Sequence, residues 1–212
     1  HIGEIESTNP CGEQPLLPYE SCNLGSINLG RFVKDGNIEW DRLKLLIHDA
    51  VHFLDNVIEA NKYPLQQIHD MTHANRKIGL GVMGWADMLI LMGIPYNSDE
   101  AVKLGKKLMQ FINDEGHAAS RELGKQRGSF PNFAGSVFDV KGAQPQRNST
   151  VTTIAPTGTI SMIANASSGV EPLFAVSYIK NVMDGTKLVE VNPNFARIAK
   201  ERGFYSEELL EK

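Results

Sequence analysis

The sequence is short of cysteine, of long apolar runs and of net charge, and each shortage excludes a class of protein. Two cysteines among 212 residues are too few for a disulfide framework, which favours a reducing cytoplasm. No run of about 18 apolar residues occurs, so the sequence predicts no transmembrane helix. The 21 basic and 25 acidic residues leave a net charge of −4. We therefore expect no general attraction to nucleic acid or to anionic membranes.

Composition and periodicity predict an α/β fold. Hydrophobic residues make up 42% and charged residues 22% of the chain, which is typical of a globular protein with a buried core. Apolar spacing and cap residues predict helices at 41–61, 85–92, 98–124 and 194–202, with another after Ser206. Residues 63–75 are expected to be a shorter helical or irregular piece. Strands are predicted at 20–33, 76–84, 148–154 and 176–183. Strands that alternate with long helices indicate α/β architecture, and residues 127–146 predict a surface loop.

One predicted strand has an unusual composition, because residues 76–84 alternate glycine with large apolar side chains. This pattern predicts a buried strand that neighbouring backbone approaches closely. Gly79, Gly81 and Gly84 have the spacing of a dinucleotide-binding loop, but in such a loop the glycines follow the strand instead of lying within it. We therefore expect no phosphate binding at these glycines.

The stretch with the most reactive chemistry is Asn9-Pro10-Cys11-Gly12-Glu13. Pro10 fixes φ and Gly12 tolerates strained backbone, so the stretch predicts a shaped loop. An amide, a thiol and a carboxylate held close together can combine hydrogen bonding, radical or nucleophilic chemistry, and base catalysis. The residues alone leave open a simple turn with a structural cysteine. The second cysteine, Cys22, follows at the start of a strand-like run.

A second candidate site is a turn after the strand predicted at 148–154. It consists of Ala155, Pro156, Thr157, Gly158, Thr159, Ile160 and Ser161. A strand, a Gly/Thr turn and a helix-compatible run at 160–166 together present free N–H groups to an anion, and three hydroxyls add donors. A kinase-type site is not expected, because no P-loop lysine is present. On the residues alone, a capped helix without a ligand is an equal alternative.

The histidines give two pairs with i, i+4 spacing, His48 with His52 and His69 with His73. Such spacing can bind a metal ion. Neither pair has a third ligand or an H-E-x-x-H motif. We expect histidines on helix surfaces and no metal site.

Three stretches, in the same order, resemble the catalytic subunit of ribonucleotide reductase. They are residues 9–13 with 22–29, residues 76–84, and residues 155–161. The first is most similar to the adenosylcobalamin-dependent class, called class II. The resemblance runs from residue 3 to about residue 185 and implies part of a ten-stranded α/β barrel with a central finger loop. It also implies that residues 1–212 are a fragment of this barrel domain, truncated at both ends and inactive in isolation.

The resemblance implies a role for each candidate residue. Cys11 becomes a thiyl radical that abstracts the 3′ hydrogen of a ribonucleotide, and Glu13 takes the 3′-hydroxyl proton. Asn9 bonds the sugar hydroxyls, and the turn at 155–161 binds the substrate phosphate. Cys22 is half of a redox pair whose other half lies outside this chain. A Cys11–Cys22 disulfide would destroy the radical site, so we expect it only as an oxidation artefact.

The implied cofactor is adenosylcobalamin, although the resemblance does not locate its contacts in this chain. The implied partners are a ribonucleotide substrate, a thioredoxin-like dithiol reductant and a second copy in a homodimer. One alternative is a class I-type catalytic subunit that draws its radical from a separate subunit. Another is a non-catalytic fragment that only binds nucleotides. The short loop between Cys11 and Cys22 and the wording of residues 156–161 favour the cobalamin class.

Overall fold

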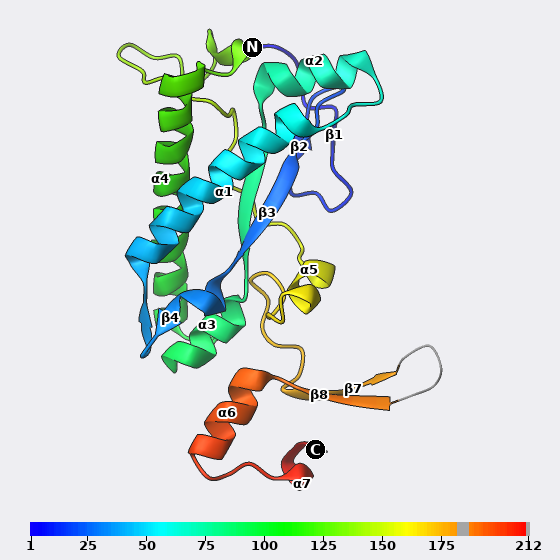
Figure 1. Ribbon diagram of the computed structural model, residues 1–212, viewed down its shortest axis with the longest axis vertical. Helices are drawn as coiled ribbons and strands as arrows, with labels where there is room; N and C mark the ends of the chain where they lie inside the picture. The colour runs from blue at the N-terminus through cyan, green and yellow to red at the C-terminus, as the bar shows by residue number, and fades with distance from the viewer. Residues whose placement is uncertain (182–186, 211–212) are drawn as a thin grey trace.

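Two parallel strands, β3 (Asn23–Asn28) and β6 (Ile78–Met83), lie at the centre of the fold (Figure 1). The computed structural model describes residues 1–181 and 187–210. Every residue of β6 is buried, which confirms the buried strand predicted at 76–84. The strand predicted at 20–33 is shorter than expected, because β6 ends where Gly84, with a φ of 76°, begins the next helix. Without a partner strand, the chain continues as the 3-10 helix η1 (Leu29–Phe32).

Two long helices, α1 (Trp40–Ala60) and α4 (Asp99–Arg127), pack with these strands in one hydrophobic core. The apolar stripe predicted for α1 is buried at Leu43, Ile47, Val51, Leu54 and Ile58. Leu46, three residues after Leu43 and therefore part of the same predicted spacing, is 38% exposed. α4 begins as predicted, because the Ser98 Oγ accepts a hydrogen bond from the Ala101 N–H at 3.1 Å. It continues past the expected end at 124 to Gly128, whose φ is 85°.

The shorter elements connect these four. α2 (Gln66–Asn75) joins α1 to β6, and α3 (Trp85–Met92) follows β6 and ends at Gly93 as predicted. β4 (Val33–Lys34) and β5 (Asn37–Ile38) form a small hairpin. The loop predicted at 127–146 is irregular apart from the 3-10 helix η2 (Pro131–Phe133). The predicted end of α3 and the predicted loop are therefore confirmed.

The strand predicted at 148–154 is wrong in part. This segment runs beside β6 and makes a single parallel bridge between Thr152 and Leu80. The N–H groups of Ile78 and Leu80, two residues apart, donate to the carbonyls of Thr150 and Val151, which are adjacent. A regular parallel ladder needs acceptors two residues apart. The register is therefore broken, and the extended segment does not become a strand.

The C-terminal part forms a hairpin and two helices below the core in Figure 1. β7 (Ser177–Asn181) pairs antiparallel with β8 (Lys187–Val191). The strand predicted at 176–183 is therefore confirmed up to Asn181, and its last two residues lie outside the described residues. β8 was not predicted. α6 (Pro193–Glu201) and α7 (Glu207–Leu210) match the two helices predicted there.

A buried ionic cluster joins the ends of the core elements. Asp55 of α1 is fully buried, and its Oδ1 accepts hydrogen bonds from Arg76 Nε at 2.9 Å and from Asn148 Nδ2 at 3.0 Å. Its Oδ2 faces Arg147 Nε at 3.3 Å and Arg127 Nη1 at 3.4 Å. One carboxylate thus ties α1 to the start of β6, the end of α4 and the extended segment. We call these five residues the Asp55 cluster.

The described residues form an α/β arrangement whose four sheets have two strands each, and they contain no closed barrel. The central parallel pair with helices packed against it fits a part of a larger α/β barrel. Among the helices of the described residues, none is long and apolar enough to cross a membrane.

Candidate active site

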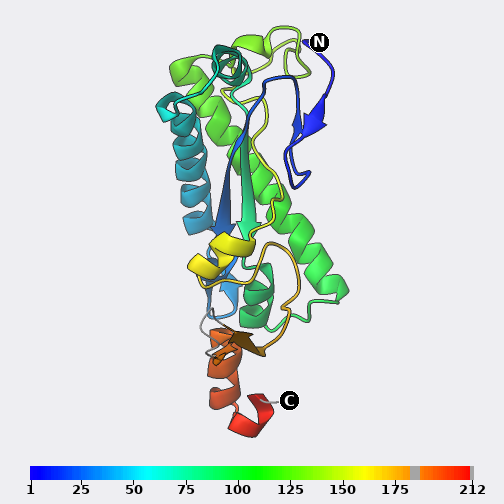
Figure 2. The same ribbon diagram turned by 90° about the vertical axis from the view of Figure 1, so that its right-hand side faces the viewer.

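A short hairpin presents the cysteine loop. β1 (Ser7–Thr8) and β2 (Pro15–Leu16) pair antiparallel, and Figure 2 shows this hairpin and α1 on opposite sides of β3 and β6. The Asn9 carbonyl accepts from the Gly12 N–H, and the Asn9 Oδ1 accepts from the Gln14 N–H, both at 3.0 Å. Gly12 has a φ of 82°, which favours glycine. The loop is therefore shaped by the residues that predicted it, and Asn9 braces it from within.

An ion pair fixes the base of this hairpin. Lys77 Nζ donates to the Pro15 carbonyl at 2.7 Å and to Glu20 Oε2 at 2.9 Å. Glu20 is 8% exposed, and its Oε1 accepts from Asn75 Nδ2 at 2.6 Å. The hairpin is thereby attached to the residue that precedes β6 and to the end of α2.

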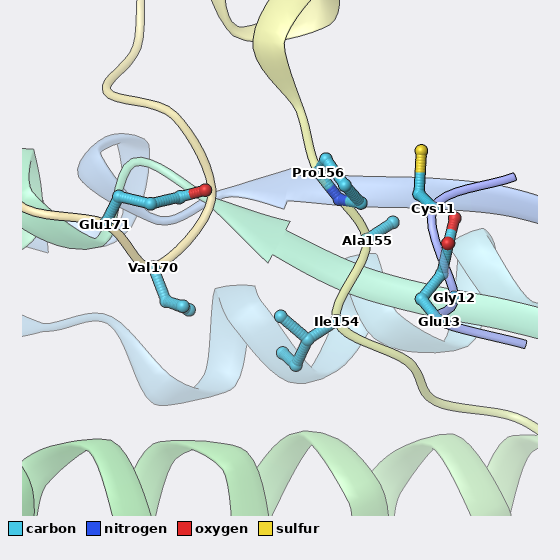
Figure 3. Close-up of a pocket in the computed structure, with 8 residues that line it drawn as sticks. All are labelled: Cys11, Gly12, Glu13, Ile154, Ala155, Pro156, Val170 and Glu171. Carbon is cyan, nitrogen blue, oxygen red and sulfur yellow. The ribbon is translucent and has the colours of Figure 1, made fainter.

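The loop and the glycine-threonine turn share a pocket of about 310 Å³. It is lined by Cys11, Gly12, Glu13, Ile154, Ala155, Pro156, Val170 and Glu171. Figure 3 shows Cys11 and Glu13 together at one end, Glu171 at the other, and Ala155 and Pro156 between them. The structure thus brings together residues from the two predicted sites.

Two features of this pocket suit it to a polar ligand. Cys11 is exposed and not in a disulfide. The Glu13 Oε2 is buried, and it has no hydrogen-bond partner within the described residues. Buried polar atoms normally have a partner, so this oxygen is an acceptor that a bound hydroxyl can satisfy.

The turn at 155–161 leads into α5 (Gly158–Ile163), which lies at the carboxyl ends of β3 and β6 (Figure 2). Its first hydrogen bond runs from the Ser161 N–H to the Thr157 carbonyl at 2.8 Å. The N–H groups of Gly158, Thr159 and Ile160 precede that bond, as expected at a helix start. All three residues are exposed.

The three hydroxyls expected to face an anion do not share one orientation. Thr157 is buried, and its Oγ1 accepts from the Gly169 N–H at 2.6 Å. Ser161 is also buried, and its hydroxyl donates to the Gly158 carbonyl at 3.2 Å. Thr159 is the exposed member of the three. Two of the hydroxyls therefore hold the turn in shape and one faces solvent.

Cys22 lies just before β3 and does not line the pocket of Cys11. It is half-buried, and its Sγ donates to the Asn23 carbonyl at 3.5 Å. Burial raises the pKa of the Cys22 thiol to about 12, against the opposing charge of Lys77 and with smaller contributions from Glu20 and Glu13. The thiol is therefore protonated throughout the physiological range.

Several residues of this region were not predicted. Glu171 and Val170 reach the pocket from a loop after α5, and Lys77 and Glu20 act at the hairpin base. No spacing in the sequence places these residues near Cys11. The one signal was the glycine pattern of β6, which indicated that something lies close against that strand.

The histidine pairs bond to other side chains. His48 Nε2 lies 2.9 Å from Glu115 Oε2, and His52 Nε2 lies 2.8 Å from Arg127 Nη2. His69 and His73 stack with ring centroids 4.1 Å apart. All four lie on α1 and α2, as expected for helix histidines.

The chain is similar to known proteins over nearly its whole length. The chain matches the profile of the family described as "Ribonucleotide reductase, barrel domain" over residues 1–146 and 139–212. It is 58% identical over 211 residues to the vitamin B12-dependent ribonucleoside-diphosphate reductase of Thermoplasma acidophilum, covering 99% of this chain and 27% of that protein. It is 53% identical over 208 residues to the enzyme of the same name from Mycobacterium tuberculosis strain CDC 1551, covering 98% of this chain and 30% of that protein.

A solved structure is also similar. The Actinobacillus ureae class Id ribonucleotide reductase alpha subunit matches with a TM-score of 0.78 and 28% identity, over 98% of this chain and 37% of that one. The chain therefore spans between about a quarter and two fifths of the length of these proteins.

Proposed function

Because the chain belongs to the ribonucleotide reductase barrel-domain family, we propose that it supplies the substrate-reducing site of a longer ribonucleotide reductase. Its share of its relatives' length, 27% and 30%, supports the interpretation of residues 1–212 as part of that protein. One observation carries the proposal. Cys11 and Glu13 of the loop lie in one pocket with Ala155 and Pro156 of the turn.

Cys11 and Glu13 act on the 3′ position of the ribose. Cys11, as a thiyl radical, removes the 3′ hydrogen atom and becomes a thiol, and its exposed sulfur at the pocket supports this role. Glu13 accepts the 3′-hydroxyl proton, which its unpartnered Oε2 supports. Asn9 uses its Oδ1 to brace the loop, so its amide N–H groups are the ones that face the sugar.

Reduction replaces the 2′ carbon–oxygen bond with a carbon–hydrogen bond and releases water, which takes two electrons and two protons. Two thiols supply both when they form a disulfide. Cys22 is one of them, and its partner lies outside this chain. The raised pKa of Cys22 supports this role, because a protonated thiol carries its hydrogen. Cys11 then returns its hydrogen to the 3′ carbon and regains the radical.

The turn at 155–161 binds the diphosphate of the substrate. The exposed N–H groups of Gly158, Thr159 and Ile160 and the Thr159 hydroxyl supply donors, and an anion is favoured at this end of a helix. Thr157 and Ser161 shape the turn from beneath. A Gly158→Pro substitution removes one of these donors and restricts φ, so it should raise the KM for nucleotide.

Relatives at 58% and 53% identity are named vitamin B12-dependent, and we extend that cofactor to this protein. When bound, adenosylcobalamin supplies the one-electron chemistry that converts the Cys11 thiol into a thiyl radical. The exposed Cys11 sulfur fits such a group, because it can be reached from outside the loop. The similarity to a class Id alpha subunit supports a second candidate, in which a separate subunit generates the radical. In both, a thioredoxin-like dithiol restores the Cys22 pair.

The test compares Cys11→Ser with Cys22→Ser in the full-length reductase that contains this sequence. Formation of deoxynucleotide is measured with adenosylcobalamin, a ribonucleoside diphosphate and a dithiol, together with nucleotide affinity. Cys11→Ser should abolish turnover with affinity nearly unchanged, because a hydroxyl is far harder to convert to a radical than a thiol. Cys22→Ser should stop repeated turnover but still allow hydrogen abstraction from the substrate.

Full activity in Cys11→Ser contradicts the radical assignment. Turnover that needs a second subunit and not adenosylcobalamin selects the second candidate. Nucleotide binding without any deoxynucleotide product, in the unsubstituted protein under both conditions, leaves a binding function only.

A further inference from the structure

Both inner glycines of β6 face one residue, Thr153. A Cβ atom at Gly79 would lie 2.8 Å from the Thr153 Cγ2, and a Cβ atom at Gly81 would lie 2.7 Å from the Thr153 carbonyl oxygen. Carbon atoms do not approach other heavy atoms so closely. A Cβ atom at Gly79 would also lie 2.5 Å from Leu24 Cδ2 and 2.9 Å from Gln14 Nε2. The glycines of β6 therefore admit Thr153 against the strand, at Gly79 together with Leu24 and Gln14.

Thr153 is held in this place and in turn holds the cysteine loop. Its N–H donates to the Leu80 carbonyl at 3.1 Å. Its hydroxyl donates to the Glu13 carbonyl at 3.0 Å. A buried strand, a threonine and the backbone of the loop thus form one continuous chain of contacts.

Thr153 directly precedes three residues that line the pocket. Ile154, Ala155 and Pro156 follow it directly and form one wall of the pocket, while Cys11, Gly12 and Glu13 form the facing wall. The hydroxyl of Thr153 bonds to the backbone of that facing wall. This hydrogen bond therefore links the two walls of the pocket directly.

We propose that Thr153 is a positioning residue, which fixes the Cys11–Glu13 loop at the correct distance from the substrate-phosphate turn. This rests on the proposed function, because it assumes that Cys11 and Glu13 act on a nucleotide held at residues 155–161. Reactions of this kind depend steeply on geometry, and a misplacement of about 1 Å can cost on the order of 100-fold in rate. Thr153 itself touches no reacting atom and acts through Glu13.

The experiment uses three variants of the full-length reductase. Thr153→Val keeps the side-chain shape but replaces the hydroxyl donor with a methyl group, which leaves the Glu13 carbonyl without that bond and pushes it away. Thr153→Ser keeps the donor. Thr152→Val is the matched control, since the neighbouring Thr152 hydroxyl donates to Asn113 Oδ1 on α4 at 3.1 Å, away from the loop.

Thr153→Val should lower kcat by roughly 10- to 100-fold, with a much smaller change in KM. Thr153→Ser should recover most of that loss, and Thr152→Val should leave kcat within about twofold of the unsubstituted protein. Hydrogen exchange of the loop amides of Gly12 and Gln14, measured on the same proteins, should become faster in Thr153→Val alone.

The two readouts separate failure of this proposal from failure of the proposed function. An inactive unsubstituted protein overturns the function, whereas the exchange rates still test the contact. Equal kcat losses in Thr153→Val and Thr152→Val, or unchanged loop exchange in Thr153→Val, overturn the positioning role. Loss of kcat in Thr153→Ser equal to that in Thr153→Val does so as well.

Discussion

The buried carboxylates of Asp55, in the Asp55 cluster, and of Glu13, in the Cys11–Glu13 pocket, differ in how many hydrogen-bond partners the protein gives them. Both oxygens of Asp55 face nitrogen donors from three other parts of the chain, at 2.9 to 3.4 Å. The Glu13 Oε2 is buried without a partner in the described residues. This difference is what we expect if Asp55 holds the fold together and Glu13 acts on a ligand, as we propose, because buried polar atoms normally have a partner.

Removing the satisfied carboxylate gives the largest expected change in stability. Asp55→Ala removes the buried carboxylate to which Arg76 Nε donates, so that Arg76 keeps Glu59 but loses Asp55. It also removes the Asp55 charge from Arg127 and Arg147. Breaking a buried ion pair in this way costs about 3–5 kcal/mol. We expect the free energy of unfolding, measured by urea denaturation, to fall by that amount.

Asp49→Ala is the matched control, because Asp49 is exposed on the same helix. It should change the free energy of unfolding by less than about 0.5 kcal/mol. A small loss in Asp55→Ala, similar to that of the control, contradicts the structural role of the cluster.

The same contrast separates the two thiols, because Cys11 is exposed and Cys22 is half-buried and hydrogen-bonded. Raising a thiol pKa from 9.0 to about 12 lowers the thiolate fraction at pH 8 by roughly 1000-fold. Iodoacetamide at pH 8 should therefore label Cys11 long before Cys22, as followed by mass spectrometry. Faster labelling of Cys22 contradicts the enclosed environment assigned to it.

The raised pKa of Cys22 also predicts how stability depends on pH. The unfolded chain ionises this thiol near pH 9.0 and the folded chain only near pH 12. The contribution of Cys22 is therefore fully present below about pH 9 and is lost as the pH rises toward 12. Cys22→Ala should reduce this loss of stability between pH 9 and pH 11, measured by urea denaturation.

Close packing beside the pocket gives a smaller effect. Gly81→Ala places a methyl group 2.7 Å from the Thr153 carbonyl oxygen, and overpacking of this kind costs about 1–3 kcal/mol. Gly105→Ala on α4 is the control, since its Cβ would lie 3.5 Å from the Trp85 ring. That control should raise the free energy of unfolding by about 0.4–1 kcal/mol. Equal effects of the two substitutions would show that Thr153 moves away freely.

Local patterns predicted the elements and the two motifs of the site. The spacing of α1, the glycines of β6 and the Ser98 cap each act within a few residues, so the sequence shows them directly. Cys11, Glu13 and Ala155 were chosen from motif resemblance, and the structure places all three in one pocket. A motif identifies chemically reactive residues by their spacing along the chain, so it can predict site residues before the fold is known.

The contacts between distant segments were not predictable in this way. Asp55 meets Arg76 and Asn148 across 21 and 93 residues, and no periodicity links them. Arg76 also adopts a left-handed φ of 48°, which its side chain does not suggest. The β-branched run at 148–154 predicted a strand, but the hydrogen-bond register against β6 decided otherwise. Contacts between distant segments therefore determine the Asp55 cluster and the conformation of residues 148–154.

The smallest expected change in stability, that of Glu13→Ala, tests the comparison between Asp55 and Glu13 most directly. Glu13→Ala removes a carboxylate that the protein itself leaves partly unsatisfied, so the usual loss from truncation should be absent. The free energy of unfolding should stay the same or rise by up to about 1 kcal/mol, as is common when a functional residue is removed. Turnover of the full-length protein should be lost at the same time.

Glu20→Ala gives the matched comparison, because Glu20 belongs to the base of the same hairpin but is satisfied. Its carboxylate accepts from Lys77 Nζ, Asn75 Nδ2 and the Leu17 N–H. Removing it takes the carboxylate away from the partly buried Lys77 ammonium, which keeps only its bond to the Pro15 carbonyl among those described. This loss should cost about 3 kcal/mol. If Glu13→Ala destabilises the chain as much as Glu20→Ala, then the Glu13 carboxylate supports the fold. Its unpartnered oxygen would then no longer mark the place of a substrate hydroxyl.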